Sequence, residues 1–190
     1  MRAREITGRP VVGLDTAAAI AEVKDVVISH SRASLVGFTL NKRGFLGSPL
    51  KEVLPWTSVR ALGRDAVMID GAGALVCDDP GIDEAVAAGR DRDVIGATVM
   101  TDAGTALGAV VDVIVEVGAT ADIIGFEVDG PGVERDRSAA TLLIPVDDTI
   151  AVSGATLMVP AATEQFVRDD LSGFGSAVQD FRARLKEGTA

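Results

Sequence analysis

Apolar and polar residues alternate through most of the first 160 residues of the chain. Residues 20–40 read IAEVKDVVISHSRASLVGFTL and contain two runs rich in β-branched residues, separated by a polar turn at residues 30–34. Branched side chains suit extended backbone that packs on a pleated face. The pattern therefore predicts a β-hairpin in this stretch.

The same pattern returns at residues 107–128 as LGAVVDVIVEVGATADIIGFEV. Landmark residues recur in the same order, 87 to 90 positions apart. A repeat of this length has the size of a small domain, whereas solenoid repeats are shorter. The chain is therefore predicted to contain two related β domains in tandem. The landmark pairs are Gly8 and Gly96, Asp25 and Asp112, Gly37 and Gly125, Pro55 and Pro145, and Met68 and Met158.

Short strands are expected around the first hairpin at residues 9–14, 50–55, 56–62 and 66–70. About six short strands with frequent turn signals favour a small barrel, because closure leaves no unpaired strand edge. The first barrel is predicted at residues 1–70 and the second at residues 94–160.

Residues 71–93 interrupt the alternation. They combine glycines, an Asp-Asp-Pro-Gly turn and an Ala-rich piece at residues 82–88 that is long enough for two helical turns. We interpret this segment as an interdomain linker with a short helix.

The apolar period lengthens after Pro160 and predicts an amphipathic helix within residues 161–190, with Thr163 as its cap. Gly173 and Gly175 would each cost about 1 kcal/mol relative to Ala, so the helix needs a surface to lie on. That surface is either the chain's own barrels or a partner, including a second copy. The apolar stripe comprises Val167, Leu171, Phe174, Val178, Phe181 and Leu185. The predicted fold is mainly β, with two tandem small barrels and a C-terminal α-helix.

Composition argues against a nucleic-acid partner. The net charge is −10, and nucleic-acid affinity depends on Lys and Arg that displace counterions. Aromatic residues make up only 4% of the chain, which leaves few surfaces on which bases could stack. No apolar run has the length of a signal peptide or a bilayer span, so we expect a cytoplasmic protein without membrane insertion.

No residue set predicts catalysis, a cofactor or a metal site, and we expect no enzyme activity. Asp25 and Asp112 belong to different barrels, whereas acid–base chemistry requires two carboxylates around one substrate. We expect each to accept hydrogen bonds within its own barrel. His30 and Cys77 are the only residues of their kinds, so the chain cannot form a His/Cys zinc site.

The candidate interaction residues lie in a basic, Gly-flanked loop at residues 41–49, with Phe45 and Leu46 at its tip. Exposed apolar residues often mark contact surfaces. The alternative is that both residues fold back onto their own barrel or pack against the other one. Trp56, the only tryptophan, joins them as a candidate contact.

The sequence resembles the PRC-barrel domain family. The resemblance rests on residues 8–12, 20–27, 35–38, 54–59 and 63–67 in the first copy. In the second copy it rests on residues 95–99, 107–113 and 144–146. The family includes the cytoplasmic domain of the photosynthetic reaction-centre H subunit and the C-terminal half of a bacterial ribosome maturation factor.

The resemblance implies a barrel that serves as a protein-binding or assembly module, with no catalytic residue common to the family. We therefore expect a non-enzymatic cytoplasmic scaffold or adaptor that binds a protein partner or self-associates through its barrels and C-terminal helix. The alternative is a ribosome-associated assembly or RNA-processing factor that acts through a ribosomal protein.

Overall fold

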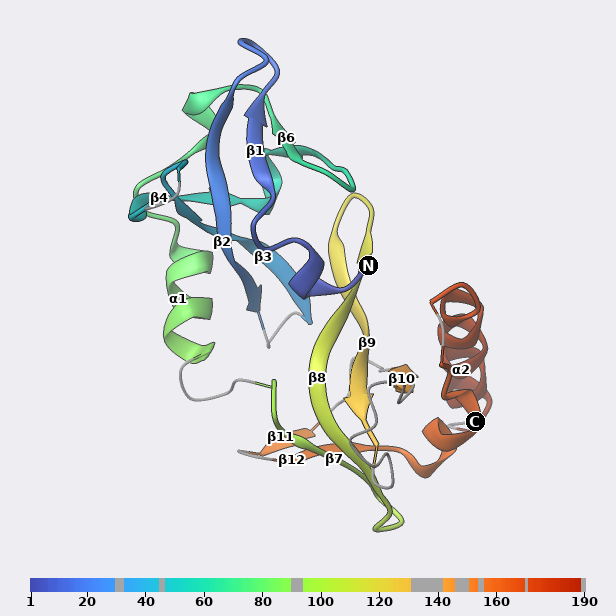
Figure 1. The fold of residues 1–190 in the computed structure, drawn as a ribbon. Coiled ribbons are helices and arrows are strands. Elements are labelled where there is room, and N and C mark those ends of the chain that lie inside the picture. The colour runs from blue at the N-terminus through green and yellow to red at the C-terminus, as the bar shows by residue number, and fades with distance from the viewer. Residues whose placement is uncertain are drawn as a thin grey trace. The chain divides into compact units, whose positions relative to one another are not determined.

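The computed structural model describes residues 1–29, 33–44, 47–89, 94–130, 142–145, 151–153, 156–169 and 171–188 (Figure 1). The chain forms two compact units. The N-terminal unit comprises residues 2–90 and 116–122, and the C-terminal unit comprises Met1 and residues 91–115 and 123–190.

The strands of the N-terminal unit pair in the order β4-β3-β2-β1-β6-β5. All of these pairs are antiparallel except β1 with β6, which is parallel. The strands are β1 (Pro10–Gly13), β2 (Ala19–Ser29), β3 (Ser34–Asn41), β4 (Pro49–Pro55), β5 (Val59–Leu62) and β6 (Val67–Ile69).

The second copy repeats this order as β10-β9-β8-β7-β12-β11, and its β7 and β12 are again parallel. The duplication predicted from the sequence therefore extends to strand order and strand direction. The strands are β7 (Thr98–Thr101), β8 (Ala106–Val117), β9 (Ala121–Asp129), β10 (Leu142–Pro145), β11 (Ala151–Ser153) and β12 (Thr156–Val159).

Equivalent aromatic and aliphatic residues fill both cores. Phe38 and Phe126 follow the repeated glycine of each copy, and both are buried. Full burial of a side chain of this size contributes about 1.5–3 kcal/mol. Burial alternates along β6 and β12, as expected for strands with one face toward a core. The prediction of a mainly β fold is confirmed.

Helix α1 (Pro80–Gly89) belongs to the core of the N-terminal unit, so its segment is more than a linker. The carboxylate of Asp79 accepts a hydrogen bond from the Ile82 amide at 2.9 Å and caps the helix. Ile82 and Ala85 are buried in a cluster with Val27. Figure 1 shows α1 alongside the strands of this unit.

The C-terminal segment begins with a 3₁₀ helix, η4 (Ala161–Phe166), and helix α2 (Phe174–Gly188) follows after a break. The expectation of one helix from Thr163 onward was wrong. Arg168 exchanges two backbone hydrogen bonds with Leu143 of β10, at 2.6 and 3.0 Å. These bonds hold the chain in an extended form, so Val167 and Leu171 precede the helix.

None of the helices in the described ranges is long and apolar enough to cross a membrane.

Candidate interaction surfaces

The loop between β3 and β4 presents exposed cations. Its base is closed by hydrogen bonds from the Lys42 amide to the Ser48 carbonyl and from the Gly47 amide to the Gly44 carbonyl, both 2.9 Å long. Lys42 and Arg43 are exposed. The predicted contact residues Phe45 and Leu46 lie outside the described residues.

Trp56 lies in the short 3₁₀ helix η2 (Trp56–Ser58), where the alternation had predicted a strand. The indole ring is half-buried, and its centroid lies 6.4 Å from that of Phe38. Its Nε1–H donates to the Ala119 carbonyl at 3.3 Å. Trp56 therefore already has packing and hydrogen-bond partners within its own unit.

The C-terminal stripe packs largely on its own unit. Phe174, Val178 and Phe181 are at most 3% exposed, and the first two form a cluster with Ile114 and Leu143. These three stripe residues therefore do not form a free surface, which favours the alternative that the helix packs on the chain's own barrel. Val167, Leu171 and Leu185 are half-buried, and Leu171 packs against the same cluster.

The repeated acids Asp25 and Asp112 lie in different units and in different environments. Asp25 is exposed, and its carboxylate accepts a hydrogen bond from the Thr39 hydroxyl at 3.1 Å. Asp112 is 3% exposed and accepts one from the Val113 amide at 2.8 Å. Both acids thus accept hydrogen bonds within their own units, as expected.

Glu127 on β9 is a second buried acid, which the sequence analysis did not single out. It occupies the position that Thr39 holds in the first copy. The change from Gly-Phe-Thr in the first copy to Gly-Phe-Glu in the second could have drawn attention to Glu127. The hydrophobic pattern alone did not reveal that this position is buried.

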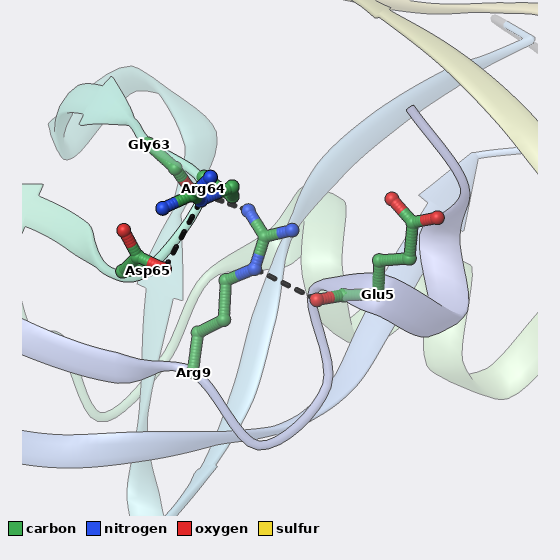
Figure 2. Close-up of polar contacts among 5 residues, drawn as sticks. All are labelled: Glu5, Arg9, Gly63, Arg64 and Asp65. Carbon is green, nitrogen blue, oxygen red and sulfur yellow. Dashed lines mark hydrogen bonds and ion pairs between the residues drawn. The ribbon is translucent and has the colours of Figure 1, made fainter. Parts of the chain in front are cut away.

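Arg9 is a buried cation that the sequence analysis also missed. Figure 2 shows its guanidinium between η1 (Ala3–Glu5) and the turn that joins β5 to β6. Nε donates to the Glu5 carbonyl at 2.7 Å, and Nη1 donates to the Gly63 carbonyl. The two carbonyl dipoles stabilise the positive charge of the buried guanidinium, which indicates a structural role for Arg9. Nearby, the exposed Arg64 and Asp65 form an ion pair of 3.3 Å.

A hollow of about 340 Å³ opens on the N-terminal unit beside Arg60. Arg60 Nε and Nη2 donate to the two carboxylate oxygens of Asp70, each at 2.7 Å. This hydrogen bonding raises the pKa of Arg60 and lowers the pKa of Asp70. The other lining residues are Thr57, Ser58, Gly71, Gly73 and Ala74.

Asp25 and Asp112 lie in different units, so these two described carboxylates do not share one site. Cys77 is exposed, and His30 lies outside the described residues. Within the described ranges, no group of three or more His, Cys, Asp or Glu side chains is arranged to hold a metal ion.

A family model described as the PRC-barrel domain matches residues 1–76 and 88–166. No curated protein matches the chain in a sequence search. The two matched segments cover well over half of the chain and correspond to the two copies of the strand pattern. The chain therefore belongs to the PRC-barrel domain family and contains two such domains in tandem.

Proposed function

We propose that this protein is a non-enzymatic cytoplasmic scaffold or adaptor whose N-terminal barrel binds a protein partner through the loop at residues 42–48. PRC-barrel domains are protein-interaction modules, which supports this class of function. The observation that carries the proposal is the exposure of Lys42 and Arg43, which shortly precede Phe45 and Leu46 in the sequence.

The two copies distinguish this loop from residues that the barrel itself requires. Phe38 and Phe126 recur in both copies and fill equivalent positions in the two cores. The basic loop with its Phe-Leu pair occurs only in the first copy, whereas the second has GPGVERDR at residues 130–137. The barrel fold does not require this loop sequence, so its composition is free to serve binding.

The expected partner surface is acidic and has an apolar pocket. Two exposed cations that precede Phe45 and Leu46 in the sequence match that chemistry, and electrostatic attraction would speed association at low salt. A second copy of this chain, with its net charge of −10, also meets the charge requirement. We therefore propose the loop as the site for either a protein partner or self-association.

The helix α2 takes a smaller part in this proposal. Phe174, Val178 and Phe181 are buried in the C-terminal unit and would have to leave its core to contact a partner. Such exposure would cost about 1.5–3 kcal/mol for each side chain. Within this proposal, only the half-buried stripe residues contact a partner, namely Val167, Leu171 and Leu185.

The test compares Phe45→Asp with the matched control Leu14→Asp in the full chain. Leu14 is a turn residue with 57% exposure, so this control adds the same charge at another exposed apolar position. Light scattering measures self-association. Affinity capture identifies a candidate partner protein, and the affinity of each variant for that purified protein is then measured. Circular dichroism checks that each variant is folded.

We expect Phe45→Asp to abolish association and Leu14→Asp to preserve it. Equal association of both variants would reject the loop as the site. The ribosome-associated alternative predicts a different result, namely co-sedimentation of the full chain with ribosomal particles at low salt.

A further inference from the structure

The hollow beside Arg60 has the features of a small polar binding site. Its lining residues come from η2, from β5, from the end of β6 and from η3 (Ala72–Ala74), all within the N-terminal unit. Its volume of about 340 Å³ lies at the lower end of the range for small-molecule sites.

Asp70 holds the guanidinium of Arg60 in a defined orientation. The pair is side-on, because it uses Nε and Nη2 of Arg60 and both carboxylate oxygens of Asp70. An arginine has five N–H groups, so this arrangement leaves Nη1 and the second hydrogen of Nη2 along another edge. Among the described residues, no further partner takes these N–H groups. A guanidinium edge of this kind binds a carboxylate or phosphate with two hydrogen bonds.

The remaining walls favour a polar ligand that approaches the backbone. Thr57 and Ser58 each supply a hydroxyl that can donate a hydrogen bond. At Gly73 the wall is open, since a Cβ added there would meet no atom within 4 Å, whereas a Cβ added at Gly71 would collide with the carboxylate of Asp15. The hollow thus combines hydroxyl and guanidinium donors with open space at Gly73.

The barrel fold does not account for these residues. Ninety positions later, between the landmarks Pro145 and Met158, the second copy has Asp147, Asp148 and Ile150, and Pro160 stands where the first copy has Asp70. The same strand order forms there without the Arg–Asp pair. Exposed ion pairs also add little to stability, and both side chains of this pair are more than 60% exposed.

We propose that this hollow binds the carboxylate or phosphate group of a small molecule, with Arg60 as the principal ligand-binding residue. The free edge of the guanidinium binds the anion, and the hydroxyls of Thr57 and Ser58 complete its hydrogen bonds. Asp70 is a positioning residue that acts through Arg60. This proposal is independent of the proposed protein-binding loop.

The test titrates the isotope-labelled full chain with inorganic phosphate and, separately, with acetate at constant ionic strength. Amide shifts in nuclear magnetic resonance spectra locate the site. Fluorescence of Trp56 gives a second signal, because this only tryptophan directly precedes Thr57. We expect saturation at millimolar concentration or below, with the largest shifts at Thr57, Ser58 and residues 70–74.

The variant Arg60→Gln should weaken binding by about tenfold or more, since it removes a charge-assisted hydrogen-bond donor. Arg64→Gln is the matched control, because Arg64 is also exposed and paired with an aspartate but does not line the hollow. Ser58→Ala should give a smaller loss. If only phosphate or only acetate gives saturable binding, the result identifies whether the hollow binds a phosphate or a carboxylate group.

The proposal is overturned if neither anion gives saturable binding, or if the amide shifts are spread over residues outside the hollow. It is also overturned if the Arg60→Gln and Arg64→Gln variants bind the anion equally well. Thermal unfolding of each variant separates lost binding from lost structure.

Discussion

Gly125 lies against the ring of Phe174, so closely that an added Cβ would collide with the ring atoms Cζ and Cε1. The N-terminal unit has the same arrangement, because a Cβ on Gly37 would collide with Ile82 of α1. Each barrel therefore carries a helix whose first buried residue rests on the repeated glycine. The duplicated unit includes this helix, and the sequence repeat had not revealed that.

The segments before the two helices support the same conclusion. Val76 exchanges two backbone hydrogen bonds with Val53 of β4, and Arg168 exchanges two with Leu143 of β10. In both units, the chain thus returns to the equivalent strand before its helix begins. Shared backbone geometry explains why unrelated side chains, Val and Arg, occupy the bridging position.

We expect Gly125→Ala to destabilise the protein by about 1–3 kcal/mol, the usual cost of overpacking a core. Gly175→Ala is the matched control, since its Cβ would meet nothing within 4 Å. That control should stabilise α2 by about 0.5–1 kcal/mol, because alanine has less backbone freedom to lose. Urea unfolding followed by circular dichroism measures both changes. Equal stability of the two variants would contradict the close contact.

Phe174→Ala should cost about 3–5 kcal/mol, as expected when a buried aromatic side chain is removed. Ser176→Ala, at an exposed position on the same helix, should change the stability little.

A chain that ends at Ala161 should also be less stable than the full chain, and its state of association in light scattering should be unchanged. A dimer that becomes a stable monomer on truncation would instead show that the stripe is an assembly interface.

Thr163→Val should raise the free energy of unfolding by about 1 kcal/mol, because it removes a buried hydroxyl without a hydrogen bond. Thr163 is fully buried, and its Oγ1 has no partner among the described residues. Thr101→Val is the matched control, since Oγ1 of this buried residue accepts a hydrogen bond from the Thr105 amide at 3.0 Å. That control should destabilise the protein. Denaturant unfolding of both variants checks the difference in sign.

Ala17→Gly should stabilise the β1–β2 turn by about 0.5–1 kcal/mol, since left-handed backbone is strained for an L-residue. Ala17 has a φ of 53°, and the equivalent Gly104 has a φ of 84°. The reverse change, Gly104→Ala, should destabilise the protein. Thermal unfolding of the two variants tests this, and a loss of stability in Ala17→Gly would refute the strain.

The carboxyl group of Asp70 should titrate below its usual pKa of 3.8, because Arg60 donates hydrogen bonds to its ionised form. A pKa that is lower in the folded state adds stability above the unfolded pKa, and this stability is lost as pH falls through the folded pKa. The effect should be small, since both side chains are exposed. Carbon-13 titration of the wild type and of Arg60→Gln measures it, and an unchanged Asp70 midpoint in the variant would contradict the pairing.

Alternation of period two and its recurrence after almost ninety residues were sufficient to predict the strands, the tandem duplication and the barrel class. The strands depend on local backbone preference and on which face is apolar, so they are visible in a short window of sequence, whereas the duplication is visible only when distant windows are compared. One strand boundary differs from the prediction. Residues 56–58 were expected in a strand and form a 3₁₀ helix.

Only the tertiary structure decided what the remaining segments do. Residues 80–89 resemble a linker in isolation, and their role depends on Gly37 and Val27, which lie far away in the sequence. The start of α2 depends on the hydrogen bonds between Arg168 and Leu143, and Arg9 is held by the carbonyls of Glu5 and Gly63. The same holds for the hollow that brings Arg60 and Asp70 together. Long-range packing sets the environment of each of these residues, whereas a sequence pattern reports mainly on near neighbours.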